Sequence, residues 1–170
     1  QNDKNSNWDR IKIDNGYYSF TDNSKEQILS NVNFSLELGK RYFLTGPSGS
    51  GKSTLLDIVL GLKELTSGKV TFLKGTEVVE IQTVGNSSIA YVPQKTVFLN
   101  ESIVANIALQ DYFNDNVDQH RLNEVLRICE ISEFAENLQN GIDHIIHEGG
   151  NSLSGGQCQR IAIARALYRY

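Results

Sequence analysis

Several features are scarce in this chain, and each scarcity excludes a class of protein. The 170 residues include only two cysteines, which is too few for a disulfide framework. No apolar run reaches the roughly 18 residues that a membrane-spanning helix needs. The 16 basic residues are outnumbered by 20 acidic ones, so the chain lacks the positive excess of a nucleic-acid-binding protein. These absences leave a globular domain with no nucleic-acid partner as the expectation.

The remaining composition is ordinary for such a domain. Hydrophobic residues make up 39% and charged residues 21% of the chain, and the length suits one domain with a real core. No methionine is present, which predicts that the sequence begins inside a longer protein. The polar residues 1–9 are interpreted as a linker, and residues 10–170 as the folded domain.

Residues 46–53 read Gly-Pro-Ser-Gly-Ser-Gly-Lys-Ser, the pattern of a phosphate-binding loop. Glycines allow a tight turn in which successive N–H groups point at phosphate oxygens. Lys52 is predicted to lie near the β- and γ-phosphates, and the Ser53 hydroxyl to bind Mg²⁺. Residues 41–45 predict a buried strand entering the loop, and residues 54–60 a helix leaving it, with its positive end toward the phosphates. The predicted nucleotide contacts here are Gly46, Pro47, Ser48, Gly49, Ser50, Gly51, Lys52, Ser53 and Thr54.

A second motif lies about a hundred residues downstream. It consists of Leu153, Ser154, Gly155, Gly156 and Gln157, and a helix is predicted from Ser154 to about Tyr168. The start of that helix would offer N–H groups, a hydroxyl and a helix dipole to an anion. A serine N-cap followed by glycine in the first turn explains the same letters and stays open as an alternative.

The two motifs together resemble the nucleotide-binding domain of ABC transporters, whose signature the second motif matches letter for letter. The resemblance implies an α/β fold of the P-loop NTPase type. It consists of an ABC ATPase core, an N-terminal antiparallel β-subdomain and a helical signature subdomain at about residues 95–153. It also implies that ATP with Mg²⁺ lies between the Lys52 loop of one domain and the Ser154–Gly156 turn of a second one.

Two further positions match this family. Gln94, at the end of the segment 90–94, would contact Mg²⁺ and the attacking water, so Lys52 and Gln94 are the predicted catalytic residues. A glutamine amide suits that role because it carries an acceptor and donors together. Phe20 falls on the position of the aromatic that stacks on adenine. Tyr18 is the alternative, and an alternating aromatic strand is also an ordinary core pattern.

The family's next motif, an apolar strand ending in Asp-Glu, has no counterpart among the 170 residues. The resemblance therefore implies that the C-terminal part of the ATPase core is missing from this sequence. We expect this chain to bind ATP without hydrolysing it efficiently, and the parent protein to hydrolyse it. A parallel sheet without its central strand would also expose an apolar edge, which predicts marginal stability for the isolated chain.

The segments 97–107 and 144–150 resemble those of ABC exporters. The expected parent is an exporter or flippase at the cytoplasmic face of the cell membrane. Its partners would be a second nucleotide-binding domain and a transmembrane domain in the same or an associated chain. A soluble ABC-type ATPase of DNA repair, chromosome structure or translation is the alternative, and a module that binds ATP without turnover is a third reading.

Periodicity predicts the remaining elements. Strands are expected at residues 10–20, 29–38, 69–73 and 88–92, and helices at 102–108, 117–130 and 132–138.

The two cysteines receive different predictions. Cys129 shares a helical face with Leu122, Val125 and Leu126, which predicts a core residue. Cys158 lies in the first turn of a helix, where a dipole lowers the pKa of a thiol; it is interpreted as a quiet surface thiol, and a reactive thiol is the alternative.

Overall fold

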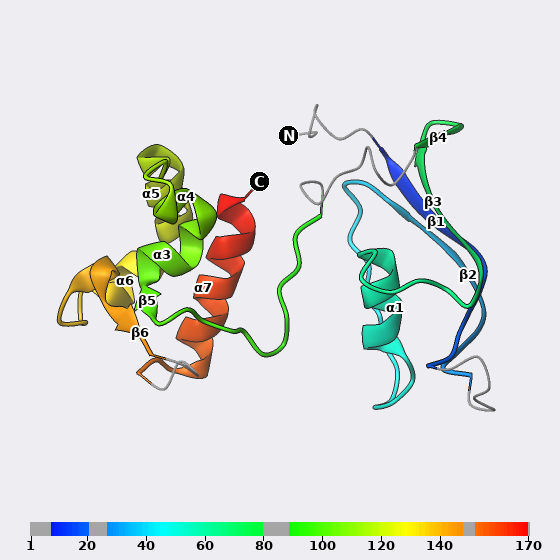
Figure 1. The fold of residues 1–170 in the computed structure, drawn as a ribbon, viewed down its shortest axis with the longest axis horizontal. Helices are drawn as coiled ribbons and strands as arrows, with labels where there is room; N and C mark the ends of the chain where they lie inside the picture. Colours follow the sequence, from blue (N-terminus) through cyan, green and yellow to red (C-terminus); the bar gives the residue numbers. More distant parts are fainter. Residues whose placement is uncertain (1–7, 21–26, 80–88, 148–151, 170) are drawn as a thin grey trace. The chain divides into compact units, whose positions relative to one another are not determined.

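The computed structural model describes residues 8–20, 27–79, 89–147 and 152–169, shown as coloured ribbon in Figure 1. The chain divides into two compact units, residues 1–89 and residues 90–170. Each unit has its own hydrophobic core and is treated by itself below. Within the described ranges, no helix is long and apolar enough to cross a bilayer.

The first unit contains an antiparallel sheet of four strands in the order β2-β1-β3-β4. The strands are β1 (Arg10–Tyr18), β2 (Leu29–Glu37), β3 (Ser67–Lys74) and β4 (Glu77–Val79). The strands predicted at residues 10–20, 29–38 and 69–73 are therefore confirmed, and β4 was not predicted. Because every pairing is antiparallel, this sheet matches the predicted N-terminal β-subdomain.

Alternation along β1 explains why these residues form a strand with one buried face. Ile11 and Ile13 are buried, whereas Lys12 and Asp14 form a surface ion pair at 2.8 Å. The core of the first unit combines sheet and helix residues. It consists of Trp8, Ile11, Ile13, Leu29, Ile58, Val59 and Phe72.

Two residues that the sequence placed in the linker are held by the sheet. Trp8 is buried, and its ring meets the edge of Phe72 with 5.6 Å between centroids. The Asp9 backbone donates to Leu73 O at 2.8 Å, and its carboxylate accepts from the Gly75 N–H at 2.6 Å. The folded unit therefore includes Trp8, because its indole buries a large apolar area against the sheet.

Helix α1 (Lys52–Val59) confirms the helix predicted after the phosphate loop. It begins after Gly51, which has the left-handed φ of 84°. It ends at Leu60 and is followed by Gly61 with φ of 73°, the conformation in which glycine commonly stops a helix. Ile58 and Val59 bury the last turn in the core, so α1 is attached to this unit by its C-terminal half.

The strands predicted at residues 41–45 and 88–92 are wrong for the described residues. Residues 41–45 and 89–92 have no strand hydrogen bonding, and Phe43 is 92% exposed. The apolar letters predicted burial, but a strand needs a neighbour to bond its N–H and C=O groups. Among the described strands, none pairs with either segment.

The second unit is mostly helical, as predicted for about residues 95–153, and it also includes the signature helix at Gly155–Tyr168. Its elements are β5 (Glu101–Ser102), α3 (Ile103–Ala108), α4 (Gln110–Phe113), α5 (Gln119–Ile128), α6 (Ile131–Ala135), η1 (Gly141–Asp143), β6 (Ile145–Ile146) and α7 (Gly155–Tyr168). The helices expected at 102–108, 117–130 and 132–138 are confirmed with shorter bounds, and α4 was not predicted. The strands β5 and β6 pair with each other.

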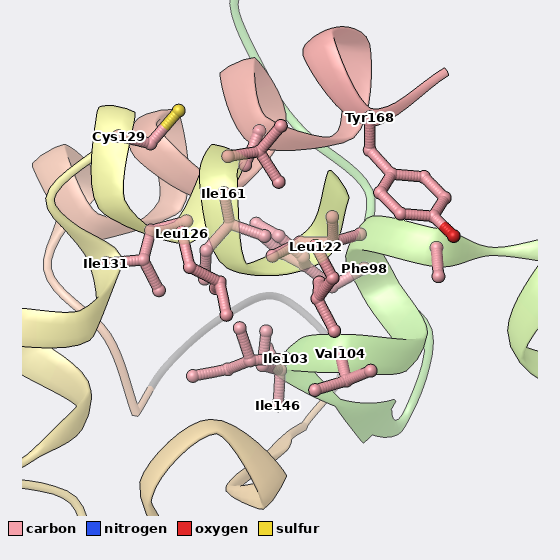
Figure 2. Packing of buried hydrophobic residues seen from close by; sticks show 14 residues of the cluster. Phe98, Ile103, Val104, Leu122, Leu126, Cys129, Ile131, Ile146, Ile161 and Tyr168 are labelled. Atoms are coloured by element: carbon pink, nitrogen blue, oxygen red, sulfur yellow. The ribbon is translucent and has the colours of Figure 1, made fainter. Parts of the chain in front are cut away.

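Figure 2 shows the core of this unit, in which side chains from α3, α5, α6 and α7 meet. Ile103, Ile131, Ile146 and Ile161 have no exposed surface. Cys129 is also buried, which confirms the core assignment, and burial raises the pKa of its thiol. The same core fixes α7 against the other helices.

Tyr168, at the end of α7, connects that helix to the start of α5. Its hydroxyl accepts a hydrogen bond from the Asp118 N–H at 2.9 Å.

Candidate functional site

The phosphate loop has the backbone that its glycines predicted. Gly46, Gly49 and Gly51 have φ values of 152°, 80° and 84°, which residues with a Cβ rarely adopt. At Gly51 a Cβ would lie 2.9 Å from a Leu29 methyl carbon, so bulk is excluded there as well. The Ser50 N–H donates to Pro47 O at 3.3 Å and closes the turn. The loop is thus a defined turn that ends at the first residue of α1.

Lys52 folds its side chain back over this turn. Its ammonium donates to Gly46 O at 2.9 Å, to Pro47 O at 2.6 Å and to Ser50 Oγ at 3.5 Å. These acceptors are neutral, so the positive charge is not cancelled by an acidic partner among the described residues. An uncompensated ammonium held by a loop of this kind is suited to an anion.

The two residues after Lys52 both carry hydroxyl groups, but only the first of them is exposed. Ser53 is exposed in the first turn of α1, whereas Thr54 is buried. The N-cap is Gly51, so no side chain covers the first N–H groups of the helix. A hydroxyl, an ammonium and open backbone donors therefore share one end of α1.

These observations agree with a bound triphosphate and its metal ion. A Cβ at Gly49 would meet no atom within 4 Å, so the loop is open there, and the helix dipole adds partial positive charge. The groups at this end of α1 include N–H donors and, at Ser53, an exposed hydroxyl oxygen of the kind that Mg²⁺ accepts. The residues present fit the group that the motif predicts.

Phe20 is exposed, whereas Tyr18 is partly buried against the core of the first unit. The two rings meet edge to face with 5.8 Å between centroids. The Lys63 ammonium lies 5.9 Å from the centre of the Phe20 ring and forms an ion pair at 2.6 Å with Asp57 of α1. The hydrogen bond to Asp57 raises the pKa of Lys63. Through Lys63 and Asp57, Phe20 is thus connected to the helix that follows the phosphate loop.

The start of α7 is built as a capping box. The Gln157 N–H donates to Ser154 Oγ at 3.3 Å, and the Ser154 N–H donates to Gln157 Oε1 at 2.8 Å. The N-cap reading of Ser154 is therefore confirmed, and it leaves the N–H groups of Gly155 and Gly156 facing outward in the first turn. Both glycines are exposed, with no atom within 4 Å of a Cβ placed on either, while Leu153 packs against the core.

The prediction of a lowered thiol pKa at Cys158 is wrong. The residue is partly buried against the core of the second unit, and this burial raises the pKa. Loss of hydration for the thiolate exceeds the benefit of its position in the first turn of α7. The favoured interpretation, a quiet thiol, agrees with the raised pKa, although the residue is half-buried rather than on the surface.

Gln94 is exposed and lies in the second unit, in a segment without regular structure. The following exporter-like segment forms a loop, β5 and α3, and the Ile103 N–H donates to His144 O at 3.1 Å. The end of the other exporter-like segment, residues 148–150, lies outside the described residues.

The predicted site residues thus fall into two groups. The first unit carries Phe20 and the phosphate loop, and the second carries Gln94 and the signature turn. Sequence reasoning missed Asp57 and Lys63, since no motif marks a contact between a loop lysine and a ring. It also missed the capping role of Gln157, which the Ser-x-x-Gln spacing would have predicted.

Comparison with known proteins places these features in a family. The family model described as ABC transporter matches residues 29–170. The chain is 38% identical over 143 residues to an ATP-dependent lipid A-core flippase of Desulfotalea psychrophila, covering 84% of this chain and 24% of that protein. It is 32% identical over 160 residues to the mitochondrial iron-sulfur clusters transporter ATM1 of Debaryomyces hansenii, covering 94% of this chain and 22% of that protein.

A solved structure agrees with these relatives. One match is a bacterial Atm1-family ABC exporter with ATP bound, with a TM-score of 0.83 and 29% sequence identity, over 97% of this chain and 28% of that chain. The chain thus spans about a quarter of the length of the proteins it matches. With the family model covering most of its residues and a matching fold, the chain belongs to the ABC transporter family.

Proposed function

We propose that this chain is the ATP-binding domain of an ABC exporter or flippase and that the native protein couples ATP hydrolysis to transport. The observation that carries the proposal is the presence, in one chain, of both halves of a nucleotide sandwich. One half is the Lys52 loop, with a positive charge bonded only to neutral acceptors. The other is the exposed Ser154–Gly156 turn at the start of α7.

On the first half, Lys52 and the loop N–H groups would hold the β- and γ-phosphates, and Ser53 would bind Mg²⁺. When bound, Mg²⁺ would neutralise charge on the phosphate oxygens during hydrolysis. The ammonium must leave Gly46 O and Pro47 O to reach a phosphate, which exchanges neutral acceptors for a charged one. Phe20 would stack on the adenine ring with its exposed face.

On the second half, the turn at Ser154 would meet the γ-phosphate held by the Lys52 loop of a second domain. The first-turn N–H groups of α7 and the helix dipole favour negative charge at this point. The capping box keeps the Ser154 hydroxyl at the helix start, so the donors are preorganised. Gln94 would orient the attacking water through its amide, once the two domains have closed.

The exporter assignment is supported by the relatives, which are flippases and an iron-sulfur cluster transporter. If the chain acts as they do, its partners are a second nucleotide-binding domain and a membrane domain, and it acts at the cytoplasmic face of a membrane. A test is to reconstitute the native protein into lipid vesicles and to measure ATP hydrolysis. Turnover that needs the membrane-embedded protein supports transport. Turnover in a soluble fraction that DNA or ribosomes stimulate would instead support the soluble ATPase alternative.

The adenine platform gives a separate prediction. Phe20→Ala should weaken Mg-ATP binding about fivefold to tenfold, since stacking of a base on an aromatic ring contributes ~1 kcal/mol or somewhat more. Phe20→Tyr should bind like the wild type. Calorimetric titration with Mg-ATP and with Mg-tripolyphosphate measures both effects. Because tripolyphosphate has no base, its affinity should not change in Phe20→Ala, and an equal loss for both ligands would contradict the assignment.

A further inference from the structure

A polar side chain with no exposed surface lies in the second unit and is not among the predicted nucleotide contacts. Asn106, in α3, is 0% exposed. Its Oδ1 accepts from the Leu99 N–H at 2.8 Å, and its Nδ2 donates to Leu99 O, Glu101 O and Ser102 O at 3.1 to 3.2 Å. One amide thus holds the backbone of the loop at residues 99–102, both by donating and by accepting. An aspartate or an aliphatic residue of similar size could not do both.

Arg165 of α7 also forms hydrogen bonds with Asn106. Its Nε donates to Asn106 O at 2.8 Å, and one terminal nitrogen donates to Asn106 Oδ1 at 3.2 Å. The other terminal nitrogen donates to Val97 O at 3.1 Å, and the guanidinium lies 5.7 Å from the centre of the Phe98 ring. A single planar group therefore connects α7, α3 and the segment at residues 97–98.

The charge of Arg165 is not needed to balance an acid. Among the described residues, no carboxylate lies within ion-pair distance of it. Burial of the guanidinium lowers the pKa of Arg165, as expected for a cation without a counter-charge. Withdrawing even part of a cation from water is costly, so an uncharged residue at this half-buried position would bury the same surface at less cost. Arginine therefore acts here through its planar guanidinium, which reaches several acceptors at once, rather than through its charge.

We infer that Arg165 and Asn106 are positioning residues that lock the segment 97–102 to the signature helix α7. The inference rests on the proposed function. Val97 follows Gln94 by three residues, and Ser154 lies eleven residues before Arg165, roughly 16 Å along one continuous helix. While these hydrogen bonds are in place, residues 97–102 and the turn at Ser154–Gly156 move as one body. When the hydrogen bonds of Arg165 are lost, the segment 97–102 and the turn can move independently of each other.

The test uses Arg165→Lys in the native protein that carries this chain. Lysine keeps the positive charge but lacks the planar fork that reaches Val97 O and Asn106 at once. We expect kcat for ATP hydrolysis to fall at least tenfold and KM for ATP to stay within twofold, because the phosphate loop is not touched. The matched control is Arg160→Lys on the same helix. Arg160 bonds Glu130 on the surface, so its replacement should leave kcat unchanged.

A second measurement is made without nucleotide. Amide hydrogen exchange at Leu99, whose N–H is held by Asn106, should become at least tenfold faster in Arg165→Lys and stay unchanged in Arg160→Lys. Normal kcat or normal Leu99 protection in Arg165→Lys would overturn the inference, as would equal effects of the two variants. Absence of ATP turnover in the wild-type protein would overturn the proposed function itself. In that case hydrogen exchange at Leu99 still shows whether Arg165 and Asn106 hold the segment 97–102 against α7.

Discussion

Replacing Lys52 with alanine is expected to abolish measurable binding of Mg-ATP, with a loss in affinity of about a hundredfold or more. Lys52 is the only charged residue in the sequence 46–53, and charge-assisted hydrogen bonds to phosphate contribute roughly 1.5–3 kcal/mol each, so losing two of them, to the β- and γ-phosphates, costs about a hundredfold or more. Without it, the loop would keep its N–H donors and helix dipole but not its full charge. Calorimetric titration of Mg-ATP into the wild type and the variant measures this difference.

The control for this titration removes a lysine of the same unit from a different place. Lys12→Ala deletes an exposed partner of Asp14 on the sheet, so ATP affinity should be unchanged. Thermal melting checks that Lys52→Ala remains folded, which is expected because its contacts are confined to an exposed loop. Equal affinities for wild type and Lys52→Ala would remove the phosphate loop from the proposal.

Ser154→Asp should leave ATP binding intact and lower ATP hydrolysis by the native protein about a hundredfold or more. Aspartate caps a helix as well as serine does, so the start of α7 would persist. The new carboxylate would, however, face the γ-phosphate of the partner domain, and like charges at such short range repel by several kcal/mol. Turnover and ATP affinity, measured on the same preparation, separate closure from binding.

Ser154→Asn supplies the matched neutral variant. Asparagine has nearly the same size as aspartate and caps helices equally well, so only the charge differs. We expect Ser154→Asn to retain turnover within about tenfold of the wild type, because a neutral polar group still faces the phosphate. If the Asp and Asn variants hydrolyse ATP at the same rate, the turn at Ser154 does not contact a phosphate, and the sandwich arrangement would be wrong.

Local signals explain which parts of this chain could be predicted from its letters. The glycines of the phosphate loop, the helix after it and the stop at Gly61 each follow from the backbone preferences of a few adjacent residues. The same holds for the alternating strand β1 and for Ser154 as the first residue of the signature helix. Recognition of the family rested on these short segments, and the family model agrees with it.

Interactions between distant residues explain what could not be predicted. Residues 41–45 have the letters of a buried strand, yet strand geometry depends on a hydrogen-bonded neighbour rather than on composition. Trp8 lies in a polar stretch and is buried because Phe72 of β3 lies next to it. The thiol pKa of Cys158 is set by the core against which the helix packs, and it is raised where position alone predicted a decrease.

The sequence by itself therefore determined the phosphate-loop and signature motifs, their helices and the family, because each depends on contiguous residues with fixed backbone preferences. Only the tertiary structure decided that Lys63 and Asp57 connect Phe20 to α1, and that Arg165 meets Asn106 across 59 positions of the chain. Contacts of that kind depend on which elements pack against each other. Their side chains obey no spacing rule that one sequence can reveal.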